Sequence, residues 1–124
     1  MERANTNSSL FRFQNFEIWK RAIELIDKLL DVAEELDKLH KYKFAEQLRS
    51  AALSITNNIA EGSGSSSKQE FKQFLNYSRR SVYEVANMLF VFHRRKYINE
   101  QQRDSFLNEL EQLSKMILGF SRSL

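Results

Sequence analysis

The feature that most constrains this chain is the spacing of its apolar residues. They recur at alternating steps of three and four from Trp19 to Leu36, again from Phe71 to Phe92 and again from Phe106 to Leu124. This spacing is typical of the seam along which a helix packs against other helices. The 124 residues include no proline and only three glycines, so a β-rich or loop-rich fold would lack its usual turn residues. The sequence therefore predicts an all-α fold.

The helices are predicted to form one bundle behind a short arm. Residues 1–15 are polar and rich in Asn and Ser, and we expect a flexible N-terminal arm whose apolar end docks on the core. Residues 16–124 are expected to form the bundle, with helices at about 16–39, 44–61, 67–94 and 99–121. Short connections favour antiparallel neighbours, which predicts an antiparallel up-down-up-down four-helix bundle.

Three helix ends carry recognisable capping signals. Gly62 follows the second apolar series, where a left-handed C-terminal cap with positive φ is expected. Ser67 with Glu70, and Asn99 with Gln102, have the spacing of capping boxes. These signals place the boundaries of the second, third and fourth helices.

The composition excludes several classes of chemistry. The chain has no cysteine, which excludes disulfides, iron–sulfur clusters and thiolate zinc sites. A di-iron bundle needs two Glu-x-x-His pairs, but only His40, three residues after Asp37, approaches that pattern. We expect no metal, no cofactor and no enzymatic activity. With neither a signal peptide nor an apolar run long enough for a membrane span, the expected compartment is the reducing cytoplasm.

The middle of the chain is its basic part. Residues 41–96 carry ten basic and four acidic residues, a net charge of +6, whereas the whole chain carries +3. Such a segregated field can attract an anionic polymer. No recognition helix or RNA-binding signature is present, so contacts to phosphates would dominate. The candidate nucleic-acid-binding residues are Lys41, Lys43, Arg49, Lys68, Lys72, Arg79, Arg80, Arg94, Arg95 and Lys96.

A group of polar residues lies beside the apolar face of the second helix: Ser54, Asn57, Asn58 and Glu61. Buried polar groups need hydrogen-bond partners, and networks of them can define helix register. We favour this structural role, in which Glu61 pairs with a basic residue. The alternative is that these side chains contact a ligand.

The segment from Gln47 to Gly62, QLRSAALSITNNIAEG, resembles the signature QLRRAAxSIxxNIAEG of a known family, and the segment from Phe16 to Ala22 resembles that family's opening. The family is that of bacterial proteins encoded in intervening sequences of 23S ribosomal RNA genes, which also includes the accessory variability determinant of diversity-generating retroelements. Its most specific signature residues are Asn58, Ile59, Ala60, Glu61 and Gly62. The resemblance implies an antiparallel four-helix bundle in a ring-like homopentamer, with a basic surface for nucleic acid and no catalytic activity.

The first helix carries a second apolar line beside its seam, at Ile18, Leu25, Val32 and Leu39. Leaving such residues in water would forgo roughly 1.5–3 kcal/mol each, and an exposed apolar patch usually marks an interface. We therefore expect a cyclic homo-oligomer with these four residues at its interface.

Two hypotheses for function follow. The first is a non-enzymatic oligomeric scaffold that binds ribosomal RNA, another structured RNA or an RNA/DNA intermediate through its basic surface. The second is a protein-interaction module, for instance an accessory subunit of a reverse transcriptase.

Overall fold

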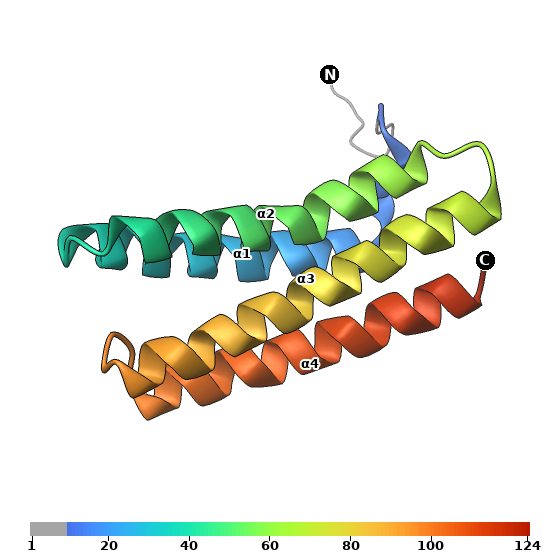
Figure 1. The fold of residues 1–124 in the computed structure, drawn as a ribbon. Helices are drawn as coiled ribbons and strands as arrows, with labels where there is room; N and C mark the ends of the chain where they lie inside the picture. Colours follow the sequence, from blue (N-terminus) through green and yellow to red (C-terminus); the bar gives the residue numbers. More distant parts are fainter. Residues whose placement is uncertain (1–9) are drawn as a thin grey trace, which may run out of the picture.

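Four long helices make up almost all of the described chain. The computed structural model describes residues 10–124. A 3₁₀ helix, η2 (Arg12–Asn15), precedes α1 (Glu17–Lys38), α2 (Tyr42–Ser63), α3 (Lys68–Arg94) and α4 (Glu100–Arg122). Successive helices run in opposite directions (Figure 1), and residues 10–124 contain no strand. The predicted all-α, antiparallel four-helix bundle is confirmed.

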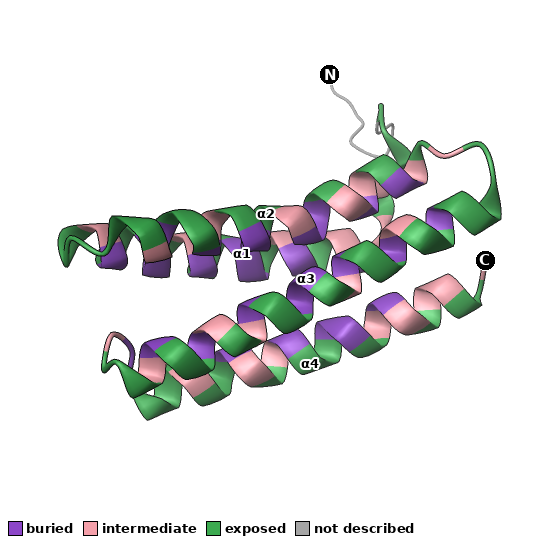
Figure 2. Ribbon diagram, viewed as in Figure 1, coloured by how far each residue is buried: buried purple, intermediate pink, exposed green. Residues whose placement is uncertain are grey.

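The predicted seams form the core. On α1 the residues Ala22, Leu29 and Ala33 are fully buried, and Leu75, Val85 and Leu89 on α3 belong to the same buried cluster. Figure 2 shows buried residues on the faces that the helices turn toward one another. The three-and-four spacing therefore reports packing inside one bundle.

The second apolar line on α1 lies in the bundle, which corrects the expectation of an exposed interface. Ile18, Leu25 and Val32 are only 3%, 2% and 7% exposed, whereas Leu39, just beyond the helix, is 50% exposed. The inward arc of α1 is wide because α2 and α4 both pack against this helix. These residues therefore leave no apolar stripe on the surface of α1, and they give no argument for an oligomer.

Gly62 differs from its predicted role as well. It lies in the last turn of α2, and none of the described glycines has positive φ. A Cβ added to Gly62 would lie 2.7 Å from Phe74 Cβ and 2.9 Å from Phe71 Cδ1. Glycine is needed here because α3 crosses α2 too closely for a side chain.

The helix starts agree with their capping signals to different degrees. At α4, Asn99 Oδ1 accepts from the Gln102 amide at 2.7 Å, and Gln102 Oε1 accepts from the Asn99 amide at 2.9 Å, so the predicted capping box is complete. At α3, Ser67 Oγ accepts from the Glu70 amide at 3.1 Å, but the reciprocal bond from Glu70 is not formed.

The end of the predicted arm is ordered against the bundle, while residues 1–9 lie outside the described residues. Within η2, Arg12 donates from Nε and Nη2 to the carbonyl oxygen of Ser63, at 3.0 and 2.8 Å. Its guanidinium also lies 5.4 Å from the ring centre of Phe71. The end of the arm thus docks on the bundle as expected, but through Arg12 as well as apolar residues: Arg12 satisfies a free carbonyl at the C-terminus of α2, where a positive charge is favourable.

Among residues 10–124, none of the helices combines the length and the sustained apolarity that a membrane span requires.

Candidate nucleic-acid interface

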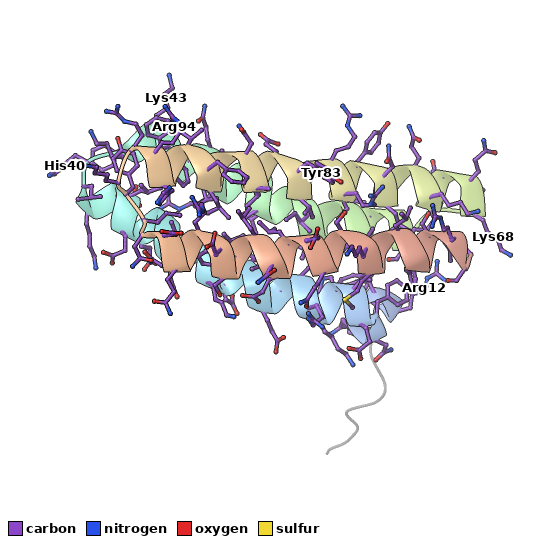
Figure 3. All side chains as sticks on the ribbon, turned by 90° about the horizontal axis from the view of Figure 1, so that it is seen from below. Arg12, His40, Lys43, Lys68, Tyr83 and Arg94 are labelled. Carbon is purple, nitrogen blue, oxygen red and sulfur yellow. The ribbon has the colours of Figure 1, made fainter. Side chains whose placement is uncertain are left out.

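The α1–α2 and α3–α4 connections lie side by side at one end of the bundle (Figure 1). They bring five of the predicted basic residues together, and we call this surface the basic end: Lys41, Lys43, Arg94, Arg95 and Lys96. Figure 3 shows Lys43 and Arg94 at this end, close to His40. All five residues are exposed, and none forms an ion pair with any residue between 10 and 124. Their charges therefore remain uncompensated by the described chain.

The two connections share one backbone conformation. His40 and Lys96 have φ of 61° and 64°, and they are the only residues other than glycine in the described chain with positive φ. After α1, the Lys41 amide donates to the Leu36 carbonyl at 2.8 Å; after α3, the Tyr97 amide makes the corresponding bond to Phe92, also at 2.8 Å. This is the Schellman pattern, in which glycine usually occupies the left-handed position.

Placing His40 and Lys96 at these positions costs free energy, about 1 kcal/mol or more for each residue. At Lys96 the helix C-terminus offsets part of this cost, because a cation is favourable next to its free carbonyls. Both helices thus end by turning a basic or titratable side chain into solvent.

Tyr97 lies behind the cations of the basic end. Its ring packs against Phe44 and Phe92, with centroids 6.0 and 6.3 Å away, and Lys41 Nζ lies 5.7 Å from its centre. A hydrogen bond from Arg95, followed by the nearby charges of Lys41 and Arg95, lowers the pKa of Tyr97. Tyr97 was not predicted from the sequence; an aromatic directly after three basic residues was the available signal.

The other predicted basic residues are not part of this surface. Arg49 binds Asp37, which lies across the α1–α2 connection, and also Glu46 at 2.9 Å, so two carboxylates compensate its charge. Arg79 turns toward α4, where its Nε donates to the Ser114 carbonyl at 3.3 Å. Lys68 lies at the opposite end of the bundle (Figure 3), and Lys72 follows it by one turn. Arg80 lies midway along α3.

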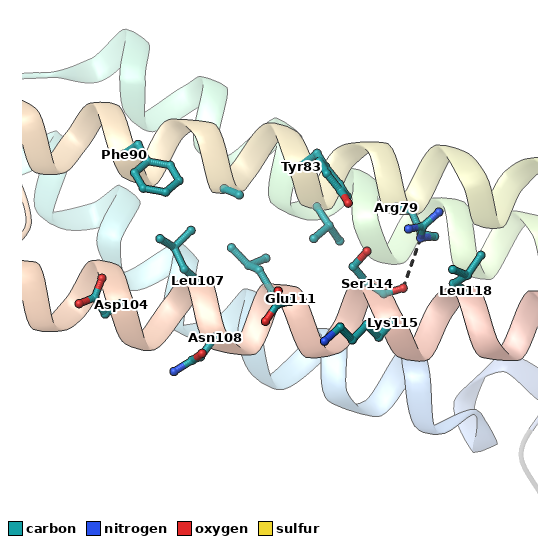
Figure 4. A pocket seen from close by; sticks show the side chains of 13 residues that line it. Arg79, Tyr83, Phe90, Asp104, Leu107, Asn108, Glu111, Ser114, Lys115 and Leu118 are labelled. Atoms are coloured by element: carbon teal, nitrogen blue, oxygen red, sulfur yellow. Dashed lines mark hydrogen bonds between the residues drawn. The ribbon is translucent and has the colours of Figure 1, made fainter.

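A groove of about 780 Å³ runs between α3 and α4 (Figure 4). Its wall includes two of the most exposed aromatic side chains in the described chain, Tyr83 at 65% and Phe90 at 49% exposure. Arg79 and Lys115 lie toward one end of the groove, Asp104 lies toward the other, and Glu111 lies between them. The exposed apolar side chains of this groove therefore come from α3, whereas the second apolar line of α1 is buried.

The comparisons with known proteins give one family. Residues 14–119 match the family described as 23S rRNA-intervening sequence protein. The chain belongs to this family. A crystal structure of a protein of unknown function from the S23 ribosomal protein family of Bacteroides thetaiotaomicron is similar in fold, with a TM-score of 0.79 at 21% identity, covering 84% of this chain and 97% of that one. No protein of curated function matches the chain.

The signature of the 23S rRNA-intervening sequence protein family has a structural role here. Asn58 is half-buried, and its Nδ2 donates to the carbonyl and the hydroxyl of Ser54 at 2.8 and 3.0 Å. Ile59 is in the core, and Gly62 allows the close crossing of α3. Glu61 is exposed and has no ion pair within residues 10–124, so the expected partner is absent there.

Proposed function

We propose that this chain is a non-enzymatic helical scaffold that binds structured RNA through its basic end. The observation that carries the proposal is the grouping of five uncompensated cations at one end of the bundle, in two connections and the adjoining helix ends. Exposed lysine and arginine side chains of this kind bind phosphates, so the contacts would be largely independent of sequence. The family description, which refers to 23S rRNA, makes ribosomal RNA the first probe. An RNA partner and the absence of cysteine fit a cytoplasmic location.

The salt dependence of binding tests this proposal. We expect an RNA hairpin from 23S ribosomal RNA to bind with an affinity that falls steeply as salt increases. Replacing Arg94, Arg95 and Lys96 by Gln should lower the slope of log K against log salt by about 2–3, since each phosphate contact contributes roughly 0.7–0.9. Fluorescence anisotropy of labelled RNA across a salt series measures the affinity and its dependence on salt.

The matched control removes three charges from α1. Lys20 and Lys28 pair with carboxylates, and Arg21 donates to Gln112 at 2.9 Å. Replacing these three residues by Gln changes the net charge equally but should leave the slope within error. Equal effects of the two triple variants would show that net charge alone, and not the basic end, governs binding. Failure of the parent protein to bind at low salt would refute the proposal.

We also propose that the chain assembles with copies of itself into a cyclic homo-oligomer, for which the family resemblance implies five subunits. The α3–α4 groove supports self-association because it exposes Tyr83 and Phe90 and is lined by both basic and acidic side chains, so that a second copy can offer complementary contacts. Phe90→Glu should break the assembly in light scattering, whereas Leu53→Glu, at an exposed position on α2, should preserve it. A monomeric parent protein would refute self-association and would favour a different protein, such as a reverse transcriptase, in the groove.

A further inference from the structure

A second recess lies on the other side of α3, at its outer seam with α2. It has a volume of about 420 Å³, and each residue that lines it carries a polar group: Ser54, Asn58, Tyr77, Arg80, Ser81 and Glu84. The recess exists because serines occupy the middle of the seam, where larger side chains would fill the space. It lies apart from the basic end and from the α3–α4 groove.

Hydrogen bonds hold the floor of this recess in one arrangement. Ser81 Oγ donates to Ser54 Oγ at 2.9 Å, which joins α3 to α2. Asn58 Nδ2 donates to the carbonyl and the hydroxyl of Ser54. These two bonds set the orientation of the Asn58 amide, whose Oδ1 can act as a hydrogen-bond acceptor.

The walls provide a cation and an anion that do not neutralise each other. Arg80 and Glu84 are four residues apart on α3, a spacing that places their side chains on one face of the helix. Both are exposed, and neither forms an ion pair in the described part of the chain. A ligand in the recess therefore meets a donor and a carboxylate side by side.

An aromatic ring borders the recess one turn earlier. Tyr77 is 37% exposed, and its hydroxyl accepts from Gln73 Nε2 at 2.8 Å. Its ring meets Phe74 edge-on, with centroids 6.0 Å apart. These two contacts hold the ring in place, so that a planar ligand can stack on it at little entropic cost.

We propose that this recess binds an unpaired guanine base of the RNA, an inference that rests on the function proposed above. A carboxylate can accept from both N1–H and the N2 amino group of guanine, and a guanidinium can donate to O6 and N7. Glu84 and Arg80 match these two edges, and Tyr77 offers the stacking surface. Adenine lacks the adjacent pair of donors that the carboxylate needs, and a simple anion would be repelled by Glu84.

The recess also lies within reach of an RNA held at the basic end. Arg80 precedes Arg94 by 14 residues on one continuous helix, which corresponds to about 21 Å at 1.5 Å per residue. A few nucleotides of single-stranded RNA cover this distance. Phosphate contacts at the basic end would thus hold the RNA while the recess reads one base.

The test uses four RNA hairpins that differ only in one unpaired loop nucleotide, which is G, A, C or U. We expect the parent protein to bind the G hairpin about tenfold more tightly than the other three, the discrimination typical of one bidentate base contact. Glu84→Gln should remove this preference, and any gain in affinity from the lost negative charge should be the same for all four hairpins. Glu24→Gln, which makes the same charge change at an exposed position on α1, should retain the preference.

The outcomes separate the two proposals. Equal affinity for all four hairpins, or a preference for G that survives in Glu84→Gln, would overturn the guanine site and leave the basic end intact. Absence of binding to every hairpin would overturn the proposed function and this inference with it. A hairpin with inosine, which lacks the N2 amino group, should bind with intermediate affinity.

Discussion

Adding a single methyl group at Gly62 should destabilise the bundle. The new Cβ would meet Phe74 Cβ at 2.7 Å and Phe71 Cδ1 at 2.9 Å. Phe74 Cβ is attached to the α3 backbone, so rotation of the phenylalanine side chain does not relieve the contact. Overpacking of this kind costs about 1–3 kcal/mol, and we expect a value near 3. Replacing Gly by Ala inside a helix returns about 1 kcal/mol, which leaves a net loss of about 2 kcal/mol for Gly62→Ala.

Thermal melting measures this loss against a matched control. At about 2.1 cal/mol/K per residue, the unfolding entropy of 124 residues is about 0.26 kcal/mol/K, so that 1 kcal/mol corresponds to about 4 °C in Tm. Gly62→Ala should lower Tm by about 8 °C. Gly119 lies in α4, and a methyl group added there would have no neighbour within 4 Å, so Gly119→Ala should raise Tm by about 2–4 °C. If both variants melt above the parent protein, α2 and α3 do not cross closely enough to require glycine.

Two further predictions concern the opposite ends of the bundle. Arg12→Ala should lower the unfolding free energy by about 1 kcal/mol in urea titrations, because it removes two hydrogen bonds to the Ser63 carbonyl; an unchanged midpoint would mean that η2 contributes nothing to stability. In an ultraviolet absorbance titration, Tyr97 should ionise before the other tyrosines, because Arg95 and Lys41 lower its pKa, and Arg95→Gln should delay that ionisation. Since the pKa is lowered in the folded state, the resulting stabilisation is fully present above the ordinary tyrosine pKa of about 10 and is lost as pH falls through the lowered value; the stability at neutral pH should therefore not depend on this ionisation.

Local patterns in the sequence predicted most of the fold. The seams and the Asn99–Gln102 capping box depend on residues a few positions apart, and spacing of that kind is visible before any tertiary structure is known. The role of Gly62 depends instead on how closely α3 approaches. The burial of Leu25 and Val32 likewise depends on how far two neighbouring helices wrap around α1. Both depend on how the helices are placed relative to one another, which the periodicity of a single helix does not show.

The candidate site was also predictable only where it depends on local sequence. The basic residues were visible as a segment, but their division between the two ends of the bundle follows from the antiparallel arrangement of the helices. Arg49 lies 12 residues from Asp37, and only the turn between α1 and α2 brings their side chains together. A count of charges therefore overestimated the surface, and it overlooked Tyr97, whose contribution depends on Lys41 from the other loop.

The packing of Phe16 against Phe120, with ring centroids 4.9 Å apart, has a practical consequence. The polypeptide enters and leaves the bundle at one place, and the basic end lies at the far end of helices that are about 40 Å long, given the 27 residues of α3 and a rise of 1.5 Å per residue. A fluorophore, a surface anchor or a second protein domain joined at this place would be held away from the basic end. The same protein can therefore be immobilised or extended there while its loops remain accessible.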